Sequence, residues 1–243
     1  MVLCYNRFDK IVDEVTMKYI AHRGYSSKAP ENTVPSFNLA GEKQRFYGIE
    51  CDLYTTKDGE FVVFHDENLK RMTGIDGSIM DYTLQEIMDL KIIKGSKIKQ
   101  YPDLKIPTFE EFIDICTYYD KTAVVEIKKI HDITQLTELV DIIDNHPGLK
   151  AIIISFNLNY LKYIRAISNA ELQLLTDVIN DEIIYECRVN QLDLSMPKEM
   201  IQKDLVKKLK KEGFKIGTFT VDDSKMALEF EKLKIDYLTT NKL

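Results

Sequence analysis

The amino-acid sequence predicts an α/β fold, a closed (β/α)8 TIM barrel with a small insertion after its second strand. Three observations support this prediction. Short segments rich in β-branched and aromatic residues alternate with longer amphipathic segments, eight such units fit into the chain, and its 243 residues are a common length for a barrel. Parallel strands need crossover connections, which are usually helices, so the alternation favours a parallel sheet covered by helices. Eight units favour a closed barrel over an open doubly wound sheet.

The predicted strands share a high content of β-branched and aromatic residues. They are Tyr19–His22, Tyr47–Leu53, Ala123–Ile127, Ala151–Ser155, Leu172–Thr176, Val189–Leu194, Lys215–Val221 and Tyr237–Thr240. Helices are predicted between most of them. Thr108 is expected to cap a helix over Phe109–Tyr118, and Asp132 is expected to cap one over Ile133–Ile143. Further helices are predicted at Leu158–Ile167, Lys198–Lys211 and Ser224–Leu233.

The regular alternation stops between Tyr54 and Ile106. Lys57–Glu60 is typical of a hairpin turn before a strand at Phe61–Phe64, and a short helix is predicted near Thr83–Leu90. Barrel enzymes build active-site walls from the loops that follow their strands, so the insertion is expected to form such a wall. No low-complexity linker interrupts the chain. Residues 1–243 are therefore predicted to form one domain, with the insertion at about residues 54–106.

The overall composition is that of a soluble globular enzyme, with 44% hydrophobic and 30% charged residues. The formal net charge of −6 argues against a nucleic-acid partner, which normally requires a clustered basic face. A phosphate-bearing small molecule remains compatible, because local cations or a metal ion can reverse the sign of the charge inside a cleft. The densest basic run is expected to be a solvated helix end: Lys207, Lys208, Lys210 and Lys211.

The cysteines and the apolar segments indicate a cytoplasmic location. Cys4, Cys51, Cys116 and Cys187 are widely spaced and form no C-x-x-C pair, which suits reduced thiols. Charged residues interrupt the segment from Met1 to Lys18, so no signal peptide is predicted. No later segment is apolar over the length of a bilayer, so no stable membrane insertion is expected.

Acidic side chains occur in pairs on the predicted second and third strands. Residues two apart on a strand point to the same face, so Glu50 and Asp52 point together, and Glu126 and Lys128 do likewise. Burying several carboxylates inside a barrel is costly unless a cation compensates, and Mg²⁺ and Ca²⁺ prefer carboxylate oxygens. Ordinary ion pairs are the structural alternative. Two neighbouring polar pairs close to His22 favour a functional site instead.

Two histidines are placed for acid–base chemistry. His22 ends the first strand and His65 ends the strand after the hairpin. Because the unperturbed pKa of imidazole is close to neutral, the pair can serve as general acid and general base. A metal ion with Arg23 and Lys128 would neutralise the oxygens of a phosphodiester. The other two histidines are expected to have structural roles: His131 and His146.

A series of short motifs runs through the chain from Tyr19 onward. They are His22-Arg23-Gly24, Pro30-Glu31-Asn32-Thr33, Glu50-x-Asp52, Thr56-Lys57-Asp58-Gly59, His65-Asp66, Ile106-Pro107-Thr108, Glu126-Ile127-Lys128 and Ser155-Phe156. One tetrapeptide alone would be weak evidence, whereas the ordered set is highly specific. In order and spacing it resembles the glycerophosphodiester phosphodiesterase family, of the phosphatidylinositol-phosphodiesterase-like TIM-barrel superfamily.

The resemblance implies hydrolysis of glycerophosphodiesters to glycerol 3-phosphate and an alcohol, with Mg²⁺ or Ca²⁺ as cofactor and a small molecule as partner. It implies metal ligation by Glu50, Asp52 and Glu126, and acid–base catalysis by His22 and His65. It further implies contacts to the phosphate or substrate, or support of the metal site, by four residues: Arg23, Lys128, Glu31 and Asn32. No oligomeric state is predicted.

Two positions depart from the family's pattern. Phe219 precedes Thr220-Val221 where the family usually has tryptophan, and the chain contains no tryptophan. Asn241 follows the last strand where relatives tend to have aspartate. Phe219 is still expected to offer an apolar wall to the glycerol carbons. Both departures concern substrate preference and leave the proposed chemistry in place.

Two other functions are compatible with the motifs. A lysophospholipase D-like enzyme acting on lipid phosphodiesters would need an apolar rim on the insertion, where Leu90–Lys105 contains Ile92, Ile93 and Ile98 among many lysines. A solvated loop is the favoured interpretation of that segment. A non-catalytic barrel that binds a phosphorylated ligand is the other alternative. It is disfavoured because every expected catalytic group is present.

Overall fold

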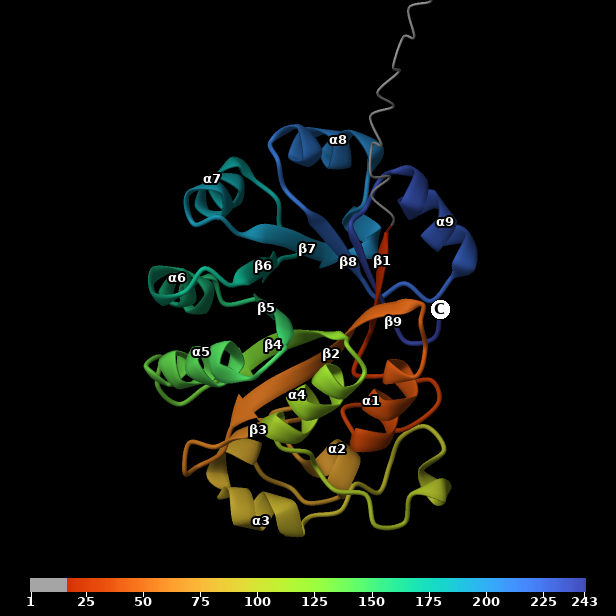
Figure 1. Cartoon of the computed structure of the whole chain (residues 1–243), viewed down its shortest axis with the longest axis vertical. Coiled ribbons are helices and arrows are strands. Elements are labelled where there is room, and N and C mark those ends of the chain that lie inside the picture. Colours follow the sequence, from red (N-terminus) through yellow and green to blue (C-terminus); the bar gives the residue numbers. More distant parts are fainter. Residues whose placement is uncertain (1–16) are drawn as a thin grey trace, which may run out of the picture.

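The computed structural model describes residues 17–243, and their strands close into a ring (Figure 1). Eight strands pair in parallel around the barrel, and β1 closes it by pairing with both β2 and β9. The strands are β1 Lys18–Ala21, β2 Phe46–Thr55, β4 Thr122–Lys129, β5 Lys150–Ser155, β6 Glu171–Leu175, β7 Asp193–Pro197, β8 Ile216–Phe219 and β9 Tyr237–Thr240. The predicted (β/α)8 barrel is confirmed.

Helices surround this ring on its outer side (Figure 1). They are α1 Val34–Gly41, α4 Phe109–Tyr118, α5 Gln135–Asn145, α6 Leu158–Ile167, α7 Asp181–Val189, α8 Lys203–Lys211 and α9 Ser224–Lys232. The predicted cap of α4 is confirmed, because Thr108 and Glu111 form a reciprocal capping box. The main hydrophobic core lies between strands and helices, with Phe37 and Phe112 packed edge to face at 4.8 Å.

A smaller apolar layer fills the inside of the barrel. It includes Ile20, Val124, Ile152, Leu175 and Tyr237, which come from five different strands. Side chains alternate along each strand, so the residue two positions further along points to the same interior. Polar residues two positions after these apolar residues therefore point into the barrel at its C-terminal end.

The insertion after β2 contains the short strand β3, Phe61–Val63, antiparallel to β2, as the predicted hairpin required. Its other elements are α2 Lys70–Thr73, η1 Ile79–Asp81, α3 Leu84–Asp89 and η2 Ile98–Gln100. The short helix predicted near Thr83–Leu90 is confirmed as α3. The insertion has a hydrophobic core of its own, which includes Leu69, Ile79 and Ile87.

Several details of the sequence prediction are wrong. Val189 ends helix α7 and the strand begins only at Asp193, because α7 packs Ile184 and Cys187 into the core and Asn180 caps it. Val189 is the one β-branched residue of the predicted strand, and the turn after it includes Gln191, which has a left-handed φ of 50°.

The helix predicted at Lys198–Lys211 consists of a 3-10 turn, η3 Lys198–Met200, and the separate helix α8. Gln202 between them has an extended backbone, with φ −125° and ψ 141°. Asp132 does not cap α5, which begins at Gln135. Its carboxylate instead accepts hydrogen bonds from the backbone and hydroxyl of Thr134, in a turn before the helix. The prediction also lacked helices α1 and α7, and α1 starts at a capping box of Thr33 and Ser36.

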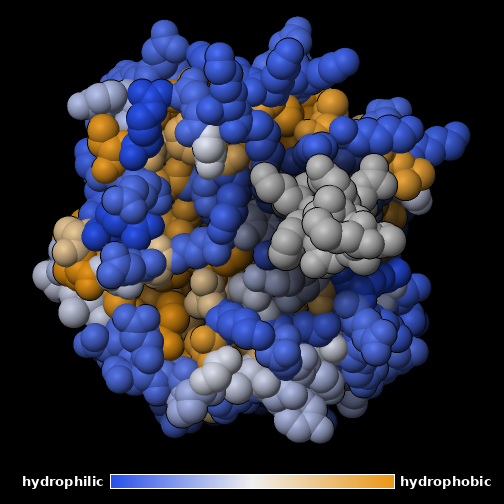
Figure 2. Space-filling model, turned by 45° about the horizontal axis from the view of Figure 1, so that its top comes forward, coloured by the Kyte–Doolittle hydropathy of each residue, from blue (hydrophilic) through white to orange (hydrophobic). Residues whose placement is uncertain are grey.

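Some predictions concern residues 1–16, which lie outside the described part of the chain. They are the absence of a signal peptide and the state of Cys4. Within residues 17–243, Cys51, Cys116 and Cys187 are buried and form no disulfide, and no helix has the length and apolarity to span a bilayer. On the face shown in Figure 2 hydrophilic side chains dominate, and apolar ones are visible mainly in the gaps between them.

Candidate active site

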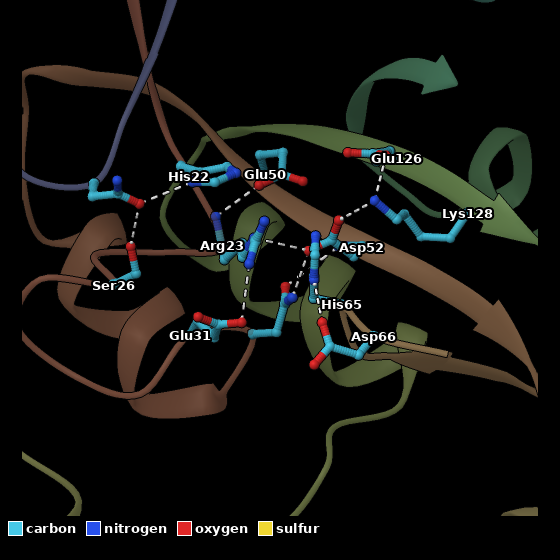
Figure 3. A network of polar contacts seen from close by, with 12 residues as sticks. His22, Arg23, Ser26, Glu31, Glu50, Asp52, His65, Asp66, Glu126 and Lys128 are labelled. Atoms are coloured by element: carbon cyan, nitrogen blue, oxygen red, sulfur yellow. Dashed lines mark hydrogen bonds and ion pairs between the residues drawn. The ribbon is translucent and has the colours of Figure 1, made fainter. Parts of the chain in front are cut away.

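The turn after β1 directs backbone groups into the barrel. Arg23 and Gly24 both have left-handed backbone conformations, with φ of 53° and 75°. A Cβ atom on Gly24 would lie 2.4 Å from Oγ of Ser36, so only glycine fits against α1 here. The turn brings the backbone N–H of Arg23 within 2.7 Å of the Glu50 carboxylate, to which it donates a hydrogen bond (Figure 3).

Three carboxylates converge at the C-terminal end of the barrel. Glu50 and Asp52 lie on β2, Glu126 lies opposite Asp52 on β4, and all three are buried. One oxygen of each lies within 4.8 Å of the others. Oε1 of Glu50 and Oδ1 of Asp52 accept no hydrogen bond among the described residues. Buried oxygens seldom lack a partner, so this donor set fits a divalent cation.

The protonation equilibria of the cluster reflect this crowding. Burial and the charges of Asp52 and Glu126 raise the pKa of Glu50 well above its usual range. Burial and the charge of Asp52 raise the pKa of Glu126 to about 7. Burial also tends to raise the pKa of Asp52, but the charges of Arg23 and Lys128 outweigh it and lower the pKa. A bound cation would favour the ionised form of all three.

Two cationic side chains flank the carboxylates. Nζ of Lys128 lies 2.8 Å from Glu126 and 3.5 Å from Asp52. Nε of Arg23 lies 3.2 Å from Asp52 on the other side. Both side chains are mostly buried, with 19% and 18% of their surface exposed. They therefore form charged contacts that a phosphate group entering the site would share.

Asn32 holds Asp52 in place. Its Nδ2 donates to Oδ2 of Asp52 at 2.7 Å, and its Oδ1 accepts from the Asp52 backbone at 3.3 Å. Asn32 is 2% exposed and has a left-handed φ of 52°. Asparagine tolerates this conformation better than most residues. The Asn32 side chain thus fixes the orientation of the Asp52 carboxylate.

A chain of ion pairs connects His65 to the barrel. Nδ1 of His65 lies 2.6 Å from Oδ1 of Asp66, whose other oxygen contacts Nε of Arg71 on α2. Arg71 also donates to Glu31 at 2.6 Å. The same Glu31 oxygen accepts from Arg23 at 3.0 Å (Figure 3). Burial raises the pKa of Glu31, but the two arginines outweigh it and lower the pKa. The chain thus runs from the insertion to the β1 turn.

His22 has a different set of partners. Its Nδ1 lies 2.8 Å from Oδ1 of Asn241, which also accepts from the hydroxyl of Ser26 at 2.9 Å. Nδ2 of Asn241 donates to Asp222 at 2.7 Å. Burial, followed by the charge of Arg23, lowers the pKa of His22, which favours the neutral imidazole.

Phe219 borders the same space as the charged groups. A cavity of about 40 Å³ is lined by residues that include His22, Glu50, Glu126, Phe156 and Phe219. The two phenylalanine rings meet edge to face at 6.1 Å. They provide an apolar wall opposite the carboxylates.

The structure brings all ten predicted site residues to one end of the barrel, through direct contacts, the ion-pair chain and the shared cavity. The other histidines lie elsewhere: His131 against the carbonyl of Met80, and His146 beside Asp114 of α4. Five residues in the network were not assigned a role from the sequence: Ser26, Asp66, Arg71, Asp222 and Asn241. Asp66 directly follows the predicted catalytic His65, and this was the one sequence signal for its role.

Comparison with known proteins shows similarity over nearly the whole chain. Residues 22–243 match the model of the "Glycerophosphoryl diester phosphodiesterase family". A glycerophosphodiester phosphodiesterase from Caldanaerobacter subterraneus subsp. tengcongensis is 30% identical over 235 residues, covering 91% of this chain and 93% of that protein. Among solved structures, an Oleispira antarctica phosphodiesterase in complex with the product sn-glycerol-3-phosphate has a TM-score of 0.85 and 28% identity. A glycerophosphodiester phosphodiesterase from Parabacteroides distasonis has a TM-score of 0.77 and 26% identity. Each structural comparison covers 93% of both chains.

Proposed function

The chain belongs to the glycerophosphoryl diester phosphodiesterase family, and we propose that it hydrolyses glycerophosphodiesters to glycerol 3-phosphate and an alcohol at this site. The observation that carries the proposal is the cluster of three buried carboxylates within 4.8 Å of one another, flanked by two cationic side chains and two histidines. Such a cluster is costly in a purely structural role. It is well suited to a metal-dependent reaction at phosphorus.

Glu50, Asp52 and Glu126 would hold the cation. The oxygens of Glu50 and Asp52 that accept no hydrogen bond among the described residues support this assignment. Carboxylate ligands without cysteine or histidine among them favour a hard ion, Mg²⁺ or Ca²⁺. When bound, the ion supplies positive charge for a phosphate oxygen.

Arg23 and Lys128 would bind the other phosphate oxygens. Both side chains are held at the carboxylate cluster by ion pairs, so they are ordered before substrate arrives. Asn32 orients Asp52 and Glu31 orients Arg23. Preorganised charges of this kind stabilise the charge that develops on phosphorus-bound oxygens.

The two histidines would move the protons. One imidazole removes the proton from the attacking hydroxyl group as its oxygen bonds to phosphorus. The other donates a proton to the leaving oxygen as its bond to phosphorus breaks, so that the alcohol departs neutral. Phe219 and Phe156 would pack against the carbon skeleton of the glycerol unit.

The insertion favours small glycerophosphodiesters over lipids. Of the isoleucines that suggested an apolar rim, Ile92 is buried and Ile98 packs against the insertion core. Ile93 alone among these three is strongly exposed, at 52%. The other exposed large apolar side chains of the insertion are Ile75 and Met88, at 43% and 44%, and three such side chains remain a small apolar surface beside its many lysines. We further propose that residues 1–243 act as one domain in the cytoplasm.

A panel of substrates titrated with metal tests this function. Release of glycerol 3-phosphate is measured from glycerophosphocholine, glycerophosphoethanolamine and glycerophosphoglycerol, and release of choline is measured from lysophosphatidylcholine as the lipid counterpart. Activity is expected on the water-soluble diesters, with loss in excess EDTA and recovery with Mg²⁺ or Ca²⁺. Turnover of the lipid alone would support the lysophospholipase D-like alternative. No turnover of any diester would support the non-catalytic one.

Substitution of the histidines tests their roles. His22→Ala and His65→Ala are each expected to lower kcat by ~10²–10⁴-fold, the usual contribution of a general acid or base. His146→Ala, on the α4 side of the barrel, is the matched control and should retain full activity. Near-normal turnover of either active-site variant would remove that histidine from the mechanism.

A further inference from the structure

The pair formed by Asn241 and Asp222 determines which nitrogen of His22 carries a proton. Asp222 accepts from the Asn241 backbone at 2.8 Å, from its Nδ2 at 2.7 Å and from the Thr240 hydroxyl at 2.9 Å. Burial raises the pKa of Asp222, but these hydrogen bonds outweigh it and lower the pKa. The carboxylate is therefore ionised at neutral pH and acts only as an acceptor.

The Asp222 carboxylate, which can only accept hydrogen bonds, fixes the orientation of the Asn241 amide. Its NH₂ group must face Asp222, because the reverse orientation would bring two oxygens together at 2.7 Å without a proton between them. Oδ1 of Asn241 therefore faces His22 at 2.8 Å, and the Ser26 hydroxyl donates to the same oxygen. Since Oδ1 can only accept, Nδ1 of His22 must be the donor.

The neutral His22 ring consequently has its hydrogen on Nδ1 and a free lone pair on Nε2. Nδ1 is engaged by Asn241, so Nε2 is the nitrogen left for the cavity that His22 lines. The partner is a neutral amide, which does not favour the charged imidazolium as a carboxylate does. The charged groups around His22 are Arg23, Glu31, Asp52 and, across the cavity, Glu50 and Glu126.

His65 has a carboxylate, and not an amide, as the partner of its Nδ1. Its Nδ1 contacts the carboxylate of Asp66, which Arg71 holds from the other side. The two histidines thus differ in the partner of Nδ1, an amide oxygen for His22 and a carboxylate for His65.

We propose that Asn241, oriented by Asp222, is a positioning residue that keeps His22 in the Nδ1–H form, so that His22 is the general base and His65 the general acid. The assignment of base and acid rests on the proposed function. The tautomer of His22 does not, since it follows from hydrogen bonds alone. At position 241, where relatives tend to have aspartate, the present chain has a neutral amide, and the negative charge lies on Asp222, which accepts a hydrogen bond from that amide.

NMR of the ¹⁵N-histidine-labelled protein tests the tautomer without turnover. The chain has four histidines, so a spectrum of His22→Ala identifies the His22 signals. We expect a protonated Nδ1 and an unprotonated Nε2 at neutral pH in the wild type, and a mixture of tautomers in Asn241→Leu. A wild-type ring protonated on Nε2 alone would overturn the proposal.

Exchange of the two side chains tests the division of roles. Asp222→Asn combined with Asn241→Asp retains the hydrogen bonds but moves the carboxylate into contact with His22. A carboxylate partner raises the pKa of an imidazole by about 1–3 units, and a base acts only when neutral. The acidic limb of the kcat/KM profile is therefore expected to move to higher pH by about one unit or more. An unmoved limb would refute the assignment of His22 as base.

Replacement of Asn241 by leucine tests the positioning role directly. Asn241→Leu is expected to lower kcat by ~10²-fold with KM unchanged, because binding groups remain in place while the base loses its orientation. Asn145→Leu, an exposed substitution at the end of α5, is the control and should leave kcat, KM and the spectrum unchanged. Wild-type kcat in Asn241→Leu would contradict a positioning role. If the wild type hydrolysed no diester, the proposed function would fail, while the NMR experiment would still decide the tautomer.

Discussion

Replacement of Glu126 by glutamine is expected to stabilise the metal-free protein and to remove most of its stabilisation by a divalent cation. Glu126 is 9% exposed and lies opposite Asp52. Burial and the Asp52 charge raise its pKa from 4.5 to about 7. A group whose pKa is raised on folding contributes stability that is complete below the unfolded pKa. This stability is lost as the pH rises through the folded value.

The size of the effect follows from the shift in pKa. About 2.5 pKa units at 1.36 kcal/mol each correspond to about 3 kcal/mol of unfolding free energy, lost by the metal-free wild type between pH 4.5 and pH 8. Glutamine carries no charge and avoids this loss. For a chain of 243 residues, about 3 kcal/mol corresponds to a difference in Tm of about 6–12 °C. A cation at 100 times its Kd would return about 2.7 kcal/mol to the wild type.

Thermal unfolding followed by circular dichroism at pH 6 and pH 8 measures both effects, in EDTA and in excess Mg²⁺ or Ca²⁺. The matched control is Glu229→Gln, an exposed substitution in α9, which should follow the wild type throughout. In EDTA at pH 8, Glu126→Gln should melt above the wild type, and in excess cation the order should reverse. The reasoning is refuted if the metal-free variant melts at or below the wild type at pH 8. It is equally refuted if the cation raises both Tm values alike.

Three other substitutions probe the support of the site. Arg71→Met removes charged hydrogen bonds to the carboxylates on both sides and should lower kcat about tenfold at an unchanged metal requirement, by steady-state kinetics. Gly24→Ala combines a left-handed φ with a contact of 2.4 Å to Ser36, and should lower Tm by at least about 4–8 °C, equivalent to about 2 kcal/mol. Leu69→Ala in the insertion core and Leu161→Ala in the main core should each cost about 2–5 kcal/mol in urea unfolding. Only Leu69→Ala should also lower kcat. Equal kcat values for the two variants would show that the insertion core does not support the site.

The barrel was predictable because its signals are local and repeated. Alternating strands and helices specify a parallel sheet, and eight repeats specify closure, so errors at single elements did not change the fold. The misplaced strand before Asp193 shows the limit. Val189 resembles the start of a strand until the packing of α7 through Ile184 and Cys187 is known, and packing is a tertiary property.

The site was predictable where a strand carries it. The period of two placed Glu50 and Asp52 on one face, and the parallel register then brought Glu126 opposite Asp52. Arg71 and Asp222 could not be assigned in this way. Their contacts join segments 40 and 19 residues apart in sequence, and no local pattern relates an arginine on a short helix to Glu31.

The charges at the proposed metal site also affect the binding of a phosphodiester substrate. The chain as a whole carries a formal charge of −6, so its long-range field disfavours a phosphodiester anion. A bound cation favours the ionised form of all three carboxylates, which together with the two cationic side chains then carry a charge of −1. A divalent ion changes this local charge to +1, the complement of a phosphodiester monoanion. Chelation is therefore expected to weaken substrate binding as well as catalysis, so a metal titration should alter KM together with kcat.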